Sequence, residues 1–366
     1  MGGNGMNGAQ PVRLVVAGAG LIGQEHIKRI LAEPAARLAG IVDTAPQAKT
    51  QAETLDVPWA PDLATILGLV KPDGVIVSLP NQFHFSAGMT LVERGIPMLM
   101  EKPVCATVDE ALRLADAAEK AAVPVLVGHH RRHSPLTRRA KEIIDSGRLG
   151  TITAVVGLSF FLKSDDYYEG KFSWRRELGA GVVMINLIHV IDDLRNLCGD
   201  IVTVQAVESN AVRNFAVEDT AAVIVRFANG ALGTLTITDA AAAPWCWEMT
   251  AGENKAYPRT DEFCYIIAGT KASLSVPRLE LWHHGTAPNS WSPIHAERIR
   301  VPDQDPYTLQ LRSDPLALEM RHFCDVVRRT ATPLLDARGG ACTLEATLAV
   351  KTAAATGQTV HLSSAR

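Results

Sequence analysis

Three glycines open the stretch of the chain whose spacing most clearly indicates chemistry. Gly18, Gly20 and Gly23 follow an apolar run at 12–17 that is rich in β-branched residues, and apolar residues at helical intervals come after them. The order of strand, tight turn and helix directs the free N–H groups and the positive dipole end of the helix at the turn, where they bind phosphate. In this arrangement Gly18 allows the turn, Gly20 admits a pyrophosphate and Gly23 lets the helix approach the strand.

A carboxylate follows where such a motif needs one. Asp43 ends a second apolar run, at 38–42, and from the tip of a strand it can accept both hydroxyls of an adenosine ribose. The simpler interpretation is a turn aspartate before Pro46. Strand, glycines, helix and Asp43 together predict a dinucleotide site, and the lack of an arginine or lysine beside Thr44 favours NAD over NADP.

The composition is that of a globular protein. Of 366 residues, 47% are hydrophobic and 20% charged, and the net charge of −3 indicates no nucleic acid or anionic membrane as partner. No apolar run approaches the roughly 20 residues that a membrane helix needs. The six cysteines are scattered without a C-x-x-C pair, which favours reduced thiols in a cytoplasmic protein. Residues 1–10, rich in glycine and asparagine, are interpreted as a disordered tail and not as a signal peptide.

Strands and helices alternate through the first third of the chain. This predicts an α/β Rossmann domain with a mostly parallel, doubly wound sheet over residues 11–128. From Pro135 onward β-like runs dominate, and Asn229-Gly230 indicates a hairpin, so residues 129–366 are expected to form an α+β domain with a large, mainly antiparallel open sheet. The expected strands are 12–17, 38–42, 74–79, 97–100, 123–127, 152–162, 202–212, 221–227, 231–238, 265–267 and 279–282, and later helices are expected at 46–55, 61–69, 82–94, 107–120, 135–146, 181–197, 315–330 and 343–355.

Polar residues gather where the strands of the first domain end, the edge at which such sheets bind ligands. Lys102, fixed between Glu101 and Pro103, could hydrogen-bond a substrate oxygen and stabilise it as it loses a proton, although a surface lysine in a loop is the simpler interpretation. The histidines at 129, 130 and 133 have spacings that could ligate a metal. No acidic or cysteine partner lies nearby in the sequence, so no metal site is expected.

Four segments appear in order along the chain, at 80–84, 101–103, 128–135 and 179–192. They are Pro-Asn-Gln-Phe-His, Glu-Lys-Pro, Gly-His-His-Arg-Arg-His-Ser-Pro, and Gly-Ala-Gly followed by His-Val-Ile-Asp. Together they resemble the glucose–fructose oxidoreductase/inositol dehydrogenase family, often called Gfo/Idh/MocA, from about residue 12 to the C-terminus. The resemblance implies a Rossmann domain that carries NAD(P), and an α/β domain whose open sheet supplies the substrate site and the oligomer contact. It also implies that the lysine of Glu-Lys-Pro is catalytic and that the following proline is often cis.

The helix expected at 181–197 carries the second half of the implied site. Asn186 and His189 are three residues apart and share a helix face, which Asp193 continues. The helix is apolar almost all round, so its polar side chains need partners, and a satisfied core histidine is the plain alternative for His189. Many relatives carry an aspartate four residues before this histidine, where this chain has Ile185, which cannot titrate. Asn186 can bind a hydroxyl but cannot act as a base, which leaves the histidine and the lysine of Glu-Lys-Pro to handle protons.

Aromatic residues supply further candidates. Trp174 and Arg175 precede the glycine-rich helix start, where relatives often contact substrate. A tryptophan face suits a sugar ring, and an arginine fork suits hydroxyls or a carboxylate; simple packing with a surface charge is the alternative. The segment 244–248 either lines the substrate pocket or packs at an oligomer interface, and the sequence leaves both open.

The sequence therefore predicts an NAD(H)-dependent dehydrogenase or reductase that acts on a secondary alcohol or ketone of a sugar, cyclitol or related polyol. An NAD-dependent glycosidase acting through transient oxidation and a non-catalytic NAD-binding regulator are the alternatives. A homodimer or homotetramer is expected, because a sheet with few helices leaves an apolar face to cover. The expected cofactor contacts are Gly18, Gly20, Leu21, Ile22, Gly23, Asp43, Thr44, Ser78, Pro80, Asn81, His84, Glu101, Lys102 and His130, and the expected substrate contacts are Lys102, His129, Trp174, Arg175, Asn186 and His189.

Overall fold

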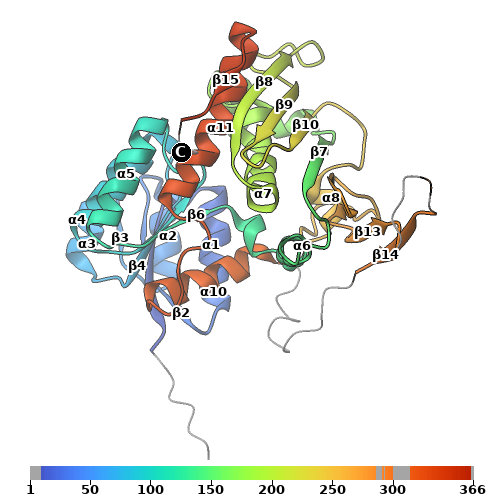
Figure 1. Cartoon of the computed structure of the whole chain (residues 1–366). Helices are drawn as coiled ribbons and strands as arrows, with labels where there is room; N and C mark the ends of the chain where they lie inside the picture. Colours follow the sequence, from blue (N-terminus) through green and yellow to red (C-terminus); the bar gives the residue numbers. More distant parts are fainter. Residues whose placement is uncertain (1–9, 286–290, 292, 300–313, 364–366) are drawn as a thin grey trace, which may run out of the picture. The chain divides into compact units, whose positions relative to one another are not determined.

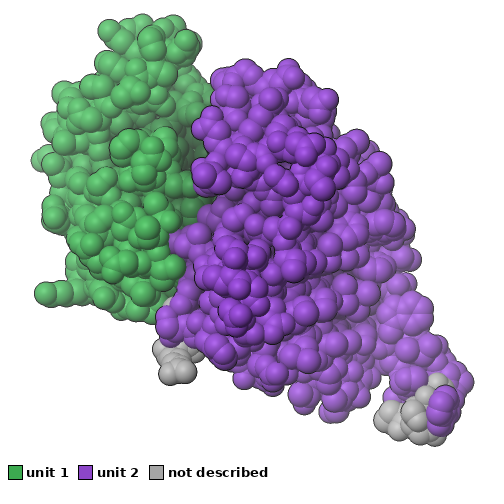
Figure 2. Space-filling model, turned by 90° about the horizontal axis from the view of Figure 1, so that it is seen from above, with its two compact units in different colours: residues 1–130, 316–341 green, residues 131–315, 342–366 purple. Residues whose placement is uncertain are grey.

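The chain folds into two compact units in the computed structural model, which describes residues 10–285, 291, 293–299 and 314–363. Unit 1 comprises residues 1–130 and 316–341, and unit 2 comprises residues 131–315 and 342–366 (Figure 2). The tail expected at 1–10 lies almost entirely outside the described residues. Every helix in the described part of the chain is too short or too polar to cross a lipid bilayer.

Unit 1 is built on a six-stranded, fully parallel sheet with the strand order β3-β2-β1-β4-β5-β6 (Figure 1). The central strands are buried on both faces, as a parallel sheet covered by helices requires. This strand order is that of the dinucleotide-binding fold, and the predicted Rossmann class is confirmed. The strands are β1 (Val12–Ala17), β2 (Ala36–Val42), β3 (Trp59–Ala60), β4 (Gly74–Val77), β5 (Met98–Glu101) and β6 (Val125–Gly128).

The helices of unit 1 begin where the sequence offers caps. Asp62 accepts the N–H of Thr65 at the start of α3, and Thr107 with Glu110 forms a capping box at the start of α5. A short 3-10 turn, Asn81–Phe83, precedes α4, so the helix expected from residue 82 begins at His84. The helices are α1 (Leu21–Ala32), α2 (Pro46–Thr54), α3 (Leu63–Leu69), α4 (His84–Glu93), α5 (Val108–Lys120) and α10 (Pro315–Val327).

Residues 316–341 differ from the expected division of the chain, which placed everything after residue 128 in the second domain. Helix α10, orange in Figure 1, buries Met320, Phe323 and Cys324 in the same core as Leu14 and Ile76 of the parallel sheet. An amphipathic helix can bury its apolar face on any uncovered sheet, and periodicity does not say which sheet that is. Helix α11 (Ala337–Thr356) then crosses from unit 1 into unit 2.

Unit 2 is built on a nine-stranded sheet with the order β14-β13-β12-β11-β7-β10-β9-β8-β15. All neighbours are antiparallel except β7 and β10, which confirms the mainly antiparallel α+β class. The sequence did not predict β12, β14 or the two-residue edge strand β15. The strands are β7 (Ile152–Phe160), β8 (Ile201–Ser209), β9 (Thr220–Phe227), β10 (Leu232–Thr238), β11 (Tyr265–Gly269), β12 (Ala272–Val276), β13 (Glu280–His283), β14 (His295–Arg298) and β15 (Val360–His361).

One face of this sheet packs against helices. Gly157 of β7 lies under helix α7 (Ile188–Cys198), where an added Cβ would meet Leu235 at 2.8 Å and Leu194 at 3.2 Å. The helix therefore approaches the sheet closely, and its buried residues Val190 and Ile191 join the strand residues in one core. Two further helices of this unit are α6 (Pro135–Asp145) and the short α8 (Trp247–Ala251).

Candidate functional site

The glycine-rich turn of unit 1 has the shape that a bound diphosphate needs. Gly18 adopts a φ of 95°, which side chains other than glycine rarely reach. A Cβ on Gly23 would lie 1.9 Å from the carbonyl oxygen of Gly18, so α1 can approach the turn only with glycine there. Over Gly20 an added Cβ would meet nothing within 4 Å, so the backbone faces open space at the helix N-terminus. The Ser78 hydroxyl donates to the Gly18 carbonyl at 2.7 Å and ties β4 to this turn.

Asp43 is held at the same turn by the backbone. One carboxylate oxygen accepts the N–H of Ala19 at 2.6 Å, and the other accepts the N–H of Ala45 at 2.8 Å. Each oxygen keeps a lone pair for a ribose hydroxyl. Thr44 is exposed, and the ammonium of Lys49 lies over the Trp59 ring at 5.6 Å from its centroid. These residues fit an adenosine dinucleotide, and Asp43 supplies negative charge where a 2′-phosphate would lie.

We expect NAD to bind at least about tenfold more tightly than NADP. A 2′-phosphate would meet the fixed carboxylate of Asp43 in a like-charge contact that costs about 1–3 kcal/mol. Dissociation constants for NAD and NADP, measured side by side, check this. Asp43→Asn should bring the two dissociation constants closer together. Asp56→Asn serves as the matched control, because Asp56 is exposed and its left-handed backbone suits asparagine equally well. Equal affinities in the wild type would contradict the expectation.

Lys102 follows directly after β5, at the carboxyl edge of the sheet, and is half-buried. The Lys102–Pro103 peptide is cis, as the family resemblance implied. The preceding residue holds this segment in place: Glu101 accepts the Lys102 N–H at 3.2 Å and pairs with Nε2 of His26 at 2.7 Å. Burial opposes ionisation of Glu101, but the hydrogen bond and charge of His26 outweigh it, so the pKa of Glu101 is lowered. Glu101 therefore acts as a buried support for Lys102.

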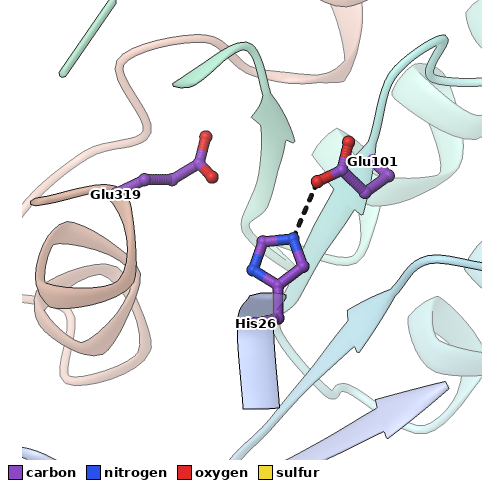
Figure 3. A group of neighbouring side chains, drawn as sticks. All are labelled: His26, Glu101 and Glu319. Carbon is purple, nitrogen blue, oxygen red and sulfur yellow. Dashed lines mark hydrogen bonds and ion pairs between the residues drawn. The ribbon is translucent and has the colours of Figure 1, made fainter. Parts of the chain in front are cut away.

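His26, Glu101 and Glu319 point toward one another inside unit 1 (Figure 3), with their nearest ligand-type atoms within 4.8 Å. Burial raises the pKa of Glu319 well above its usual range, which favours its neutral form. The 2.7 Å contact between His26 and Glu101 is a hydrogen bond. Two atoms that ligate the same tetrahedral metal, each about 2.0–2.2 Å from the ion, lie farther apart than this. In the part of the chain that the structure describes, this is the one such group of three, and it does not include the histidines at 129, 130 and 133.

His84 requires a correction of its expected role as a cofactor contact. Its ring is fully buried, with Nδ1 2.8 Å from the Pro103 carbonyl oxygen and Nε2 2.8 Å from the Leu79 carbonyl oxygen. Burial lowers the pKa of this histidine, against the opposing effect of its hydrogen bonds to the Leu79 and Pro103 carbonyls. Both nitrogens face the backbone, and His84 braces the loops after β4 and β5. The sequence placed it at the correct edge of the sheet but could not show which way the ring points.

The other expected cofactor contacts remain predictions. Leu21, Pro80 and Asn81 are exposed beside the carboxyl edge, and Ile22 and His130 are partly exposed. His129, expected as a substrate contact, is buried. A groove of about 770 Å³ also lies on unit 1, between the C-terminal end of α5 and residues 329–338. Because the lining residues 122–124 precede β6 and Val125 begins it, this groove lies at the opposite edge of the sheet from the glycine turn, and the cofactor residues do not line it.

The helix expected at 181–197 begins differently from the prediction. Residues Val183–Leu187 form a π-helical turn, closed by a hydrogen bond from the Ile188 N–H to the Val183 carbonyl, and α7 follows from Ile188. A π-turn accommodates one more residue than an α-turn, and such turns are frequent at functional sites. Side chains before it are therefore rotated relative to α7, and the face shared by Asn186 and His189 cannot be read from α-helical spacing.

Lys163 is the partner of Asn186, and the sequence reasoning did not identify it. The ammonium of Lys163 donates to Oδ1 of Asn186 at 2.6 Å, beside the first turn of α7, where His189 is 9% exposed. Lys163 follows the end of β7, three residues after Phe160. A charged residue directly after a long apolar run was the available signal, but a lysine in that place is most often solvated.

Asp193 has a structural partner in unit 2. It accepts a hydrogen bond from the Tyr265 hydroxyl at 2.7 Å and from Arg131 at 3.0 Å, while Arg131 also pairs with Glu248 at 2.5 Å. Burial raises the pKa of Asp193 to about 6, against the opposing effects of the arginine and the tyrosine. This buried network explains why polar residues occur in an otherwise apolar helix, and it assigns Asp193 to the core.

The aromatic candidates separate into two groups. Trp247 is buried and stacks on Tyr265, so this part of the segment 244–248 belongs to the core. Trp174, in a 3-10 helix over Gly170–Arg176, is 51% exposed and could offer a face to a sugar ring. Arg175 lies over the ring of Tyr167, 3.8 Å from its centroid, and donates to the Tyr167 carbonyl.

Two family profiles match consecutive parts of this chain. Residues 12–129 match a profile described as an oxidoreductase family with an NAD-binding Rossmann fold, and residues 137–275 match the GFO/IDH/MocA C-terminal domain. The chain belongs to the Gfo/Idh/MocA family of oxidoreductases. The family resemblance drawn from the sequence is thereby confirmed, as is NAD as the cofactor of the Rossmann domain.

Individual members of the Gfo/Idh/MocA family are distant from this chain. The rhizopine catabolism protein MocA of Rhizobium meliloti is 27% identical over 187 residues, 51% of this chain, which spans little more than half (57%) of that relative. The scyllo-inositol 2-dehydrogenase (NAD(+)) of Bacillus subtilis is 24% identical over 96% of each chain. A solved levoglucosan dehydrogenase, in complex with NADH and levoglucosan, has a TM-score of 0.78 at 21% identity, covering 96% of this chain and 99% of its own. This structural likeness establishes the fold.

Proposed function

We propose that the protein is an NAD(H)-dependent oxidoreductase that transfers a hydride between nicotinamide and a secondary alcohol or ketone of a sugar, cyclitol or polyol. The observation that carries the proposal is Lys102, which follows β5 at the carboxyl edge and is supported by the buried Glu101–His26 pair. A regulator that only binds NAD does not need a lysine held in place by a buried carboxylate–histidine pair. Inositol and levoglucosan dehydrogenases among the relatives support the substrate class.

In this mechanism two residues share the work on the substrate hydroxyl. Bound NAD+ would supply the acceptor for the hydride that leaves the substrate carbon. His189 takes the hydroxyl proton as the alcohol is oxidised, or returns it in reduction, since imidazole can gain and lose a proton near neutral pH. The Lys102 ammonium donates a hydrogen bond to the same oxygen and stabilises the negative charge that develops on it.

A screen for NADH absorbance tests this function. Sugars, inositols and other polyols are offered with NAD+, and their keto forms with NADH; a substrate-dependent change in absorbance supports the proposal. Turnover of glycosides by the purified protein without added NAD would instead favour the glycosidase alternative. Binding of NAD without any turnover across the screen would favour the regulator.

We further propose that the outer face of the unit 2 sheet is covered by a second copy of the chain. Val207, Ile224 and Leu232 are each at least half exposed on neighbouring strands. An apolar face on a large sheet is normally buried, and closed symmetry would pair it with itself. Light scattering at micromolar concentration should give a dimer or tetramer, and Ile224→Glu should shift the mass downward. A monomeric wild type would refute the proposal.

A further inference from the structure

Two cations of unit 2, Lys163 and Arg175, both contact one aromatic ring, that of Tyr167. The Lys163 ammonium lies 4.3 Å from the centroid of the Tyr167 ring, and the Arg175 guanidinium lies 3.8 Å from it. Two like charges at one ring repel each other, and an anion bound beside them lowers this repulsion.

The carboxylates of this region already have arginine partners. Asp239 accepts a hydrogen bond from Nε of Arg213 at 3.0 Å and another from the Tyr168 hydroxyl, and the Lys163 ammonium is 3.6 Å away from it. Glu248 pairs with Arg131. Among the described residues, Arg175 donates a hydrogen bond to the Tyr167 carbonyl but forms no ion pair with a carboxylate, and its Nε is buried without a hydrogen-bond acceptor. Positive charge is therefore in excess around Tyr167.

Lys163 lies beside residues that are expected to contact the substrate. It is 8% exposed, and its hydrogen bond to Asn186 connects it to the π-turn that precedes His189. Asn186 is partly exposed and Trp174, next to Arg175, is half-exposed. The two cations thus lie among the residues that we expect to contact the substrate.

We propose that the substrate carries a carboxylate, as in an aldonic or uronic acid, and that Lys163 and Arg175 bind this carboxylate. The inference rests on the proposed dehydrogenase function and narrows its substrate class from neutral polyols to polyhydroxy acids. An arginine can bind a carboxylate with two parallel hydrogen bonds, and the lysine adds a point charge. Asn186 holds the lysine in position without neutralising it, which an aspartate there would do.

Protonation of Lys163 provides a signature of this role. Burial lowers the pKa of Lys163 to about 8, against the raising effects of Asp239 and Glu248, and Arg175 lowers it further. The ammonium is present below that pH and is lost above it, so KM for an acid should rise as the pH passes through 8. Tyr167, whose ring both cations contact, stays neutral there because burial raises its pKa above its usual value of about 10.

The test compares matched acid and neutral pairs with NAD+, such as D-gluconate with D-glucitol and D-glucuronate with D-glucose. We expect kcat/KM for the acid to exceed that for its neutral partner at least about tenfold. Lys163→Met should raise KM for the acid about 10- to 100-fold without changing NAD affinity, since it removes a charged hydrogen bond. Asn186→Asp should act in the same direction by neutralising Lys163, and Lys163→Arg should remove the rise in KM above pH 8. Lys171→Met, at an exposed position of the same segment, is the control.

The outcomes separate this inference from the proposed function. Oxidation of the neutral members in preference to the acids would uphold the dehydrogenase and overturn the carboxylate site. If no member of any pair is oxidised, the dehydrogenase proposal fails for this class, and binding of D-gluconate to the NAD-loaded protein decides the inference alone. Saturable binding that Lys163→Met weakens at least about tenfold would support it. Absence of saturable binding, or equal binding in both proteins, would overturn it.

Discussion

Replacing His189 by alanine is expected to lower kcat for alcohol oxidation by about 10²–10⁴, the loss that removal of a general base produces. NAD affinity should stay nearly unchanged, because the dinucleotide turn belongs to unit 1 and His189 to unit 2. This chain has Ile185 where many relatives carry an aspartate, and Asp193 is bound to Arg131 and Tyr265. We therefore expect His189 to carry the proton transfer without an aspartate of its own helix.

The pH dependence of kcat/KM decides whether His189 is the base. In the wild type the rate of oxidation should rise with pH as the imidazole loses its proton, and His189→Asn should lose this ascending limb. His361→Asn, at an exposed edge strand, provides the control for loss of a histidine alone. The same ascending limb in the wild type and in His189→Asn would show that another residue is the base. Thermal unfolding of each variant separates a loss of catalysis from a loss of folding, since His189 is buried.

Lys102→Ala is expected to lower kcat/KM by about 10²–10³, the effect of removing one donor from a developing oxyanion. The effect should fall mainly on kcat, because the charge on the reacting oxygen is larger in the transition state than in the bound alcohol. Lys102→Arg should recover part of the rate, since it keeps the charge but changes its position. Stopped-flow measurement of hydride transfer, together with NAD titration, checks both variants.

Lys120→Ala is the matched control for Lys102→Ala, because this substitution also removes one positive charge from unit 1. Lys120 is exposed at the C-terminal end of α5. A Lys102→Ala enzyme with wild-type kcat would remove Lys102 from the mechanism. It would leave the His26–Glu101 pair as a purely structural feature of the β5 edge. Unchanged kcat with a raised KM would instead make Lys102 a binding residue.

The sequence determined the Rossmann unit almost completely. Glycine spacing, β-branched runs and capping residues act locally, so Gly18, Gly23 and Thr107 have in the structure the roles that their neighbours in the sequence predict. The edge of the sheet at which polar residues collect also follows from sequence, because parallel strands place their carboxyl ends together.

Tertiary structure alone decided which side chains reach one another and which way they point. Helix α10 covers the sheet of unit 1 although more than 180 residues separate it from β6, a choice that depends on which apolar surface is left uncovered. His84 turns both nitrogens to the backbone, and the π-turn before α7 changes the face that α-helical spacing predicts. The hydrogen bond of Lys163 to Asn186 and the pairing of Arg131 with Asp193 join residues far apart in sequence, so no local pattern could reveal them. Their energies depend on distance and burial, which only the folded chain defines.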